Sequence, residues 1–202
     1  MPSEFPRDYR PKATVEPLKD FNLLVSSSRG GESDANSELQ YLLRELGDKN
    51  ARTDYTIVSG LTVAKTALEP TRVVNDLRTS LRDCPWKFRY VLKVKPVRAV
   101  VACNISEIVA AAAQQVSRIR ENETFRVSVE KRRNAIPSKE IIDAVASKIP
   151  RKVELQSPGK IVMIEIIGDL AGVSVIEPSG ILGVEKEKRT TVSQPPTGQN
   201  AR

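Results

Sequence analysis

The side chains best suited to binding a charged ligand are three adjacent cations, Lys131, Arg132 and Arg133. They stand between an alternating segment, residues 125–129, and a helix expected to open near Pro137. Guanidinium and ammonium groups bind phosphate oxygens, so this corner predicts contact with a polyanion such as RNA. A solvated strand end is the alternative interpretation.

Other cations are candidates for single phosphate contacts, because they fall at expected element ends, in loops or on polar strand faces. They are Arg29, Lys93, Lys95, Arg120, Arg126, Lys160, Lys186 and Lys188. Structural alternatives exist for several of them: a cation at the carboxyl end of a helix is favoured by the helix dipole, and alternation with glutamates is typical of a solvated segment. Trp86 is expected to be a partly buried anchor rather than a platform for base stacking.

Catalytic chemistry is poorly supported by the residue types. The chain has no His, the commonest general base and metal ligand, so Ser26, Ser27 and Ser28 lack such a partner. Cys84 and Cys103 lack CxxC spacing, and they are expected to be buried thiols in a reducing compartment. We therefore expect no catalytic residue, no metal and no cofactor.

One carboxylate, Glu165, lies inside the apolar run of residues 161–167. A Lys or Arg partner, or a position at a sheet edge, would account for it structurally. The loop "SSSRGG" at residues 26–31 has the placement of a phosphate loop but lacks both GxxxxGK[ST] and GxGxxG. Nucleotide binding there is not expected, and Arg29 is expected to touch RNA.

The overall charge favours an anionic partner. The chain has 202 residues with 32 Lys and Arg against 25 Asp and Glu, a formal net charge of +7. Aromatic residues make up 4%, so the core is expected to be aliphatic. The amino terminus lacks the apolar segment of a signal peptide, and no run is long enough to cross a bilayer. These features predict a cytoplasmic protein, or a nuclear or nucleolar one if the source is eukaryotic, with no membrane partner.

The elements that must position these cations form two units. In the first, residues 21–101, strands are expected at 21–26, 55–59, 61–67 and 89–95, with helices following Ser33 and Pro70. The order is βαββαβ, the ferredoxin-like arrangement, with two helices on one face of a sheet. Residues 1–20 are expected to be a flexible lead-in, since prolines and charges cannot bury enough apolar surface.

The second unit, residues 102–186, reads as αβαβββ. Asn104 and Glu107 predict a capped helix whose apolar spacing continues to Ile119. The strand at 125–129 and the helix capped by Ser138 follow. Three more strands are expected at 153–155, 161–167 and 171–176. Residues 187–202 are expected to be a disordered tail. The fold class is therefore α/β of the α+β kind, with two small sandwiches.

The segments "TFRVSVEKRRNAIPSKEIIDAVASKI" and "KVELQSPGKIVMIEIIGDLAGVSVIEP" resemble a THUMP domain over residues 104–186. The resemblance rests on the order of features: a strand ending in a Lys/Arg cluster, a helix, the "VELQSP" phrase, and a hydrophobic strand carrying one acid. THUMP domains bind RNA and act in tRNA modification beside a ferredoxin-like module. The resemblance implies that Lys186 and Lys188 lie near the RNA-facing side.

The layout, with "RYVLKVKPVRAVVACNISEI" joining the units, resembles the stand-alone THUMP proteins that assist tRNA acetyltransferases. This implies a non-catalytic adaptor that holds serine and leucine tRNAs while a separate RNA acetyltransferase uses acetyl-CoA to form acetylcytidine. Two alternatives remain open. One is an RNA-binding subunit of another tRNA-modifying enzyme, for thiolation or methylation; the other is a basic protein-interaction module.

Overall fold

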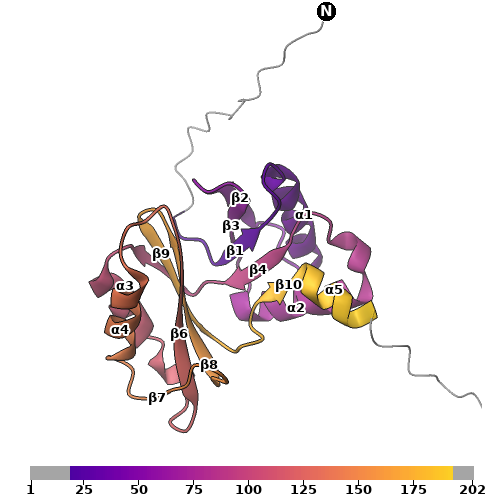
Figure 1. Ribbon diagram of the computed structural model, residues 1–202. Helices are drawn as coiled ribbons and strands as arrows, with labels where there is room; N and C mark the ends of the chain where they lie inside the picture. The colour runs from indigo at the N-terminus through magenta and orange to yellow at the C-terminus, as the bar shows by residue number, and fades with distance from the viewer. Residues whose placement is uncertain (1–18, 193–202) are drawn as a thin grey trace, which may run out of the picture.

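The computed structural model describes residues 19–192 as two five-stranded sheets packed between layers of helices (Figure 1). Most of the expected lead-in, and the part of the expected tail beyond residue 192, lie outside the described residues. Within the described range, no helix is long and apolar enough to cross a membrane.

The first unit has the predicted order βαββαβ, with strands in the order β4-β1-β3-β2 and antiparallel pairing throughout. Its elements are β1 (Leu23–Ser26), α1 (Glu32–Glu45), β2 (Arg52–Tyr55), β3 (Leu61–Lys65), α2 (Pro70–Asp83), a 3-10 turn η1 (Pro85–Lys87) and β4 (Lys93–Pro96).

Local sequence accounts for the helix ends of this unit. Pro70 occupies the first turn of α2, and the Glu69 carboxylate caps it by accepting the N–H of Arg72 at 2.7 Å. The apolar stripe predicted for α1 is buried at Leu39, Leu42 and Leu43. These side chains join those of α2 and of one face of the sheet in a single core.

Two strands of the first unit differ from the predicted ranges. The strand expected at 55–59 ends at Tyr55, and the one expected at 89–95 begins at Lys93. The second shift has a clear cause: the Glu38 carboxylate accepts the backbone N–H groups of Arg89, Tyr90 and Val91 at 2.8, 3.0 and 3.0 Å. These groups are therefore held by α1 and are not free for a strand ladder.

The second unit contains the predicted αβαβββ order, preceded by an extra strand. Its elements are β5 (Ala99–Ala102), α3 (Ile105–Ala113), the 3-10 turn η2 (Val116–Arg118), β6 (Thr124–Arg132), α4 (Ser138–Ala146), β7 (Lys152–Val153), β8 (Lys160–Ile167) and β9 (Leu170–Ile176). The sheet order is β5-β9-β8-β6-β7. The Asn104 side chain caps α3 as predicted, accepting the Glu107 N–H at 2.9 Å.

Three details of the second unit differ from expectation. The strand β5 pairs with β9, so the expected boundary between residues 101 and 102 cuts through a strand. The helix expected to continue to Ile119 ends at Ala113 and is followed by η2. Ser138 does not cap α4, because Pro137 holds the N-cap position and no side chain accepts a hydrogen bond there.

The two sheets meet through the faces that their helices leave free. Helices α1 and α2 cover the outer face of one sheet, and α3 and α4 cover the outer face of the other (Figure 1). Between the sheets, Leu24 and Val63 of the first unit share a cluster with Val97 and Ile167. The approach is close at Gly172, where an added Cβ would lie 3.0 Å from a Val97 methyl carbon.

The end of the described chain returns to the first unit. Strand β10 (Leu182–Gly183) pairs with β4, and helix α5 (Val184–Val192) contacts α2. Leu182 and Val184 are fully buried in the core of the first unit. The second unit was expected to extend to residue 186, but Leu182 and Val184 pack in the core of the first unit. Residues 187–192, expected to begin a disordered tail, are helical. The apolar residues of "GILGV" supply the burial that holds this segment in place.

Replacing Leu182 by Ala tests whether the C-terminal segment completes the first unit. Because Leu182 has 0% exposed surface, the cavity should lower the free energy of unfolding by about 2–5 kcal/mol. Urea unfolding followed by circular dichroism measures this. The exposed Lys186→Ala on α5 is the control, with an expected change within about 0.5 kcal/mol. Equal stability of both variants would contradict the assignment.

Candidate nucleic-acid interface

An ion-pair network of Lys95, Glu130, Arg132 and Glu165 connects the two units. The Lys95 ammonium of β4 lies 2.5 Å from one Glu165 oxygen and 2.8 Å from a Glu130 oxygen. Lys95 and Glu165 are 3% and 1% exposed, so the pair is removed from water. Glu165 thus has the cationic partner that its position in an apolar strand predicted.

Arg132 completes the network from β6. Its guanidinium contacts the second Glu165 oxygen at 3.0 Å and Glu130 at 2.9 Å. The parallel register places Glu130 opposite Glu165, which brings both carboxylates to the face that meets the first unit. Burial raises the pKa of Glu130, but hydrogen bonds and charge from Lys95 and Arg132 outweigh it and leave the pKa below its usual value.

The cationic corner (Lys131, Arg132 and Arg133) is split by the strand that carries it. Strand β6 continues through Arg132, so Lys131 and Arg132 project from opposite faces. Lys131 donates to the Ile136 carbonyl at 2.8 Å, and Arg132 belongs to the ion-pair network. Arg133 is exposed, has φ of +55°, and has no ion pair among the described residues.

The loop after the corner is held by Asn134. Its side-chain amide donates to the Gly168 carbonyl at 2.8 Å, and its carbonyl accepts the Ile136 N–H at 2.9 Å. These bonds fix the path of the chain directly after Arg133. The Arg133 side chain therefore extends from a loop that is anchored to the β8–β9 turn.

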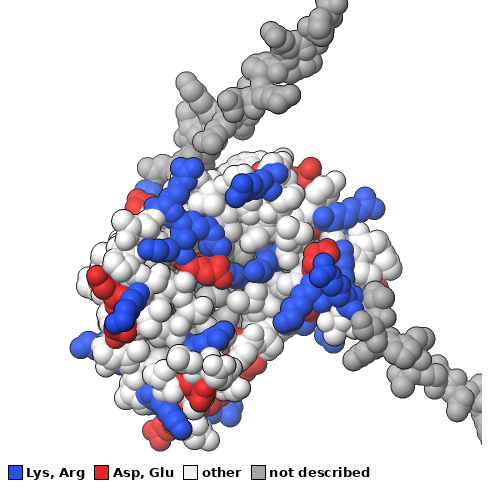
Figure 2. Space-filling view, in the orientation of Figure 1, with Lys and Arg blue, Asp and Glu red and all other residues white. Residues whose placement is uncertain are grey.

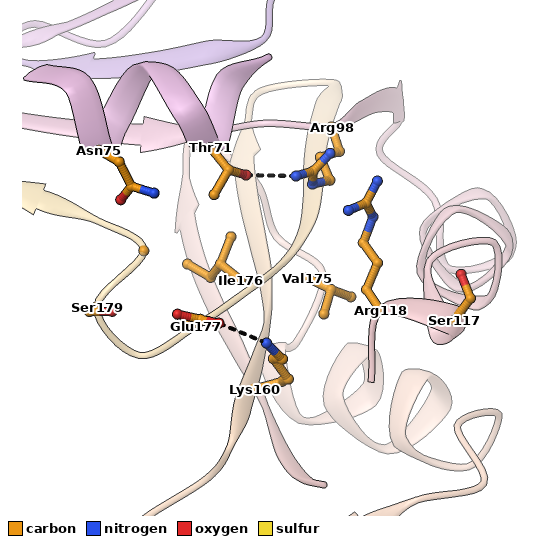
Figure 3. Close-up of a pocket in the computed structure, with 11 residues that line it drawn as sticks. Thr71, Asn75, Arg98, Ser117, Arg118, Lys160, Val175, Ile176, Glu177 and Ser179 are labelled. Atoms are coloured by element: carbon orange, nitrogen blue, oxygen red, sulfur yellow. Dashed lines mark hydrogen bonds and ion pairs between the residues drawn. The ribbon is translucent and has the colours of Figure 1, made fainter. Parts of the chain in front are cut away.

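A cleft of about 430 Å³ lies between the units (Figure 3). Its lining comes from α2, η2, the start of β8, the end of β9 and the following loop. Three cations, Arg98, Arg118 and Lys160, border it. In Figure 3 the Arg118 side chain extends toward the side of the cleft that carries Arg98.

The three cations of the cleft differ in their availability. Arg98 contacts Glu69 at 2.6 Å and donates to the Thr71 hydroxyl at 2.7 Å, while its buried Nε has no partner. Lys160 lies 3.1 Å from Glu177. Arg118 is exposed and has no ion pair among residues 19–192. Arg118 is therefore the cation of the cleft that no described residue neutralises.

A second basic surface forms where the chain returns. The pairing of β10 with β4 places Gly183 opposite Lys93, next to the start of α5, which carries Lys186. Lys188 donates to the Phe88 carbonyl at 2.7 Å. Lys93, Lys186 and Lys188 are thus brought to one region, although the sequence separates them by about 90 residues.

Other predicted contacts are scattered. Arg29 and Arg120 are exposed and have no side-chain partner within the described part of the chain. Arg126 donates to the Leu155 carbonyl at 3.2 Å, and its Nε is buried without a partner. In Figure 2, basic side chains gather over the upper end of β6 and over α5, as two separate groups on this face.

Two expectations about this surface need correction. Lys95 was expected on a basic face of the last strand of the first unit, but it is buried because the second unit covers that face of β4. Trp86 was expected to be partly buried, but 65% of its surface is exposed, because η1 turns it away from the core that takes Phe88. Arg118, which borders the cleft, was not among the predicted contacts.

Comparison with known proteins agrees with this architecture. Residues 102–176 match the family model described as "THUMP domain". Over this range the chain is similar to THUMP domains. No curated protein sequence matches the chain significantly. The matched range runs from the last residue of β5 to the end of β9.

Solved structures similar to the chain extend the likeness of fold into the first unit. PH1313 from Pyrococcus horikoshii aligns with a TM-score of 0.57 and 15% identity, covering 78% of this chain and 55% of that one. TrmN from Thermus thermophilus aligns at 0.50 and 16%, covering 78% and 46%. The chain therefore spans about half the length of these proteins, and at these identities the likeness is one of fold.

Replacing Glu165 by Leu tests the ion-pair network. The change leaves Lys95 buried without its closest carboxylate, so the free energy of unfolding should fall by about 3–5 kcal/mol. Chemical denaturation measures the loss. Combining it with Lys95→Met should recover much of the stability, because no buried charge is then stranded.

An exposed ion pair provides the matched control. Lys139 and Asp143 lie 3.0 Å apart on α4 with side chains 88% and 62% exposed. Asp143→Ala should change stability by less than about 1 kcal/mol. If Glu165→Leu were equally mild, the network would not hold the units together.

Proposed function

We propose that the protein is a non-catalytic tRNA-binding adaptor that presents tRNA to a separate RNA cytidine acetyltransferase. The observation that carries the proposal is the match of residues 102–176 to the THUMP domain. The resemblance to this family implies RNA binding in tRNA modification. The resemblance of the segment "RYVLKVKPVRAVVACNISEI" and of the order of the two units to THUMP proteins that assist tRNA acetyltransferases favours acetylation of serine and leucine tRNAs over thiolation or methylation. Acetyl-CoA would be used by the partner.

The availability of cations supports an RNA partner. Arg133 at the end of β6 and Arg118 in the cleft have no acidic partner among the described residues. Two such groups on different parts of the second unit could contact different phosphates of one folded RNA. Recognition would then depend on the spacing of phosphates, that is, on the shape of the RNA.

The ion-pair network supports a footprint that includes both units. It joins β4 of the first unit to β6 and β8 of the second, so cations on the two units keep a set spacing. A rigid pair of units loses less entropy on binding than two units joined by a linker. This favours a substrate larger than a short oligonucleotide, such as a tRNA.

Replacing each of the two arginines that lack an ion pair by alanine tests the RNA interface. Arg133→Ala and Arg118→Ala should each weaken tRNA binding and lower the slope of log K against log salt by about 1, because each removes one phosphate contact. Filter binding or fluorescence anisotropy at several salt concentrations measures both quantities. Replacing all three residues of the cationic corner is less informative, because Arg132 also supports the ion-pair network.

Lys49→Ala is the matched control for these variants. Lys49 is exposed in the turn between α1 and β2 and has no ion pair among residues 19–192. It should leave both affinity and salt slope unchanged. Failure of the wild-type chain to bind tRNA at low salt would overturn the RNA-binding proposal.

Reconstitution tests the acetylation role. The RNA cytidine acetyltransferase of the same organism, given acetyl-CoA and serine or leucine tRNA, should form acetylcytidine efficiently only when this chain is added. Mass spectrometry of digested tRNA detects the product. Acetylation at the same rate without the chain would exclude the adaptor role.

Two other outcomes would support the alternatives. Co-purification of the chain with a thiolation or methylation enzyme would support the alternative subunit role. Binding to a partner protein that persists after nuclease treatment would favour a protein-interaction module.

A further inference from the structure

The segment "WKFRY", residues 86–90, presents aromatic side chains to solvent. Trp86 is 65% exposed and Tyr90 is 42% exposed, whereas Phe88 between them is 1% exposed and lies in the core. The alternation arises because the buried Phe88 anchors the segment and leaves its neighbours outside. Exposed Trp is unusual in a protein whose aromatic share is only 4%.

The segment is held rigidly by α1. The Glu38 carboxylate accepts the N–H groups of Arg89, Tyr90 and Val91, and the Glu45 carboxylate binds the Lys87 ammonium at 2.8 Å. Four groups of residues 86–90 are held: the N–H groups of Arg89 and Tyr90, the Lys87 ammonium and the buried Phe88 ring. The exposed rings therefore sit on a preorganised support, which lowers the entropy lost when a ligand binds.

Three exposed cations lie in this segment or flank it, in the sequence or through α5, whose Lys188 donates to the Phe88 carbonyl. Arg89 belongs to the segment itself, and Lys93 begins the strand that follows it. Lys186 joins them from α5, which is attached through the Val184 N–H to the Leu92 carbonyl at 2.9 Å. Arg89, Lys93 and Lys186 are exposed and have no ion pair among the residues that the structure describes. We call Trp86, Arg89, Tyr90, Lys93 and Lys186 the aromatic–basic surface.

This composition favours a nucleic acid over a protein. The core of a protein–protein interface is depleted of lysine, and here lysine and arginine alternate with the rings. Proteins that bind single-stranded nucleic acid combine aromatic platforms for the bases with cations for the backbone. Of the two carboxylates that hold the segment, Glu45 is neutralised by Lys87, whereas Glu38 accepts neutral N–H groups and keeps its charge. Arg89, Lys93 and Lys186 outnumber this one carboxylate.

We propose that the aromatic–basic surface binds unpaired nucleotides of RNA, with Trp86 and Tyr90 stacking on bases and Arg89, Lys93 and Lys186 contacting phosphates. This inference deepens the proposed RNA-binding function and rests on it. It gives the first unit a binding role of its own, separate from the cleft and from the cationic corner. Duplex RNA, whose bases are already stacked, should not use this surface.

The sole Trp of the chain makes the test direct. Fluorescence of the full-length protein, excited at about 295 nm, should be quenched by an oligouridylate of about 12 nucleotides, because a stacked base quenches indole emission. A perfectly paired RNA duplex of the same length should quench little. Absence of quenching by the oligouridylate, at concentrations where the chain binds tRNA, would overturn the inference.

Substitutions separate stacking from charge. Trp86→Ala should weaken oligouridylate binding at least about fivefold in anisotropy with labelled RNA, without changing the salt slope, because no charge is removed. Trp86→Phe should keep most of the affinity. Tyr55→Ala, which removes a 50% exposed ring from β2, is the matched control and should have no effect.

The outcomes distinguish this inference from the proposed function. If Trp86→Ala retained full oligouridylate affinity, the aromatic–basic surface would not bind RNA, although tRNA binding through Arg118 and Arg133 would stand. If Trp86→Ala lost only binding to the partner acetyltransferase, the surface would be a protein-docking site and the inference would be wrong. If the wild-type chain bound neither tRNA nor oligouridylate, both proposals would fail.

Discussion

The buried ion pair between Lys95 and Glu165 is the contact on which the arrangement of the two units depends. Glu165 lies in an apolar strand, and both Lys95 and Glu165 are buried away from solvent. If the units separated, either both charged groups would become hydrated or one would stay buried without its partner. The second state has a high free energy, because it leaves an uncompensated charge in the protein interior. The pair therefore specifies one relative placement of the sheets, whereas the aliphatic cluster around Leu24 and Ile167 would tolerate sliding.

Ion pairs, in this network and elsewhere, distinguish the basic residues that are already neutralised from those that can bind a ligand. Lys95 and Arg132 are occupied with Glu165, and Lys160 with Glu177, so they contribute to the shape of the surface more than to its free charge. Arg118, Arg133 and Lys186 are among the cations that remain for a ligand. A net charge of +7 says nothing of where these cations are. The positions of the unpaired cations, which the ion pairs determine, tell more about a binding surface than the net charge does.

Much of the architecture was predictable, and the failures have identifiable physical causes. The helices at Pro70 and Asn104 carry their start signals in the sequence, and the THUMP resemblance rests on local segments that keep their order. The strand at Ala99–Ala102 was missed because its pairing with β9 is a long-range contact that no local spacing reports. Lys95 was misplaced for the same reason, since a lysine in an alternating strand reads as exposed until a partner unit covers it. Trp86 was misjudged because η1 turns it away from the core, which takes Phe88 instead, and local sequence does not show which of these two rings is buried. RNA contact by the predicted site residues remains a prediction.

The return of β10 and α5 to the first unit has a consequence for synthesis. The sheet and core of that unit lack their last strand and two buried apolar side chains until residues 182–184 have left the ribosome, after the whole second unit. The usual order, in which the amino-terminal unit completes its fold first as the chain emerges, therefore does not apply here. The first unit of the nascent chain keeps an open strand edge at β4 until the second unit has been synthesised and Leu182 and Gly183 pair with that edge.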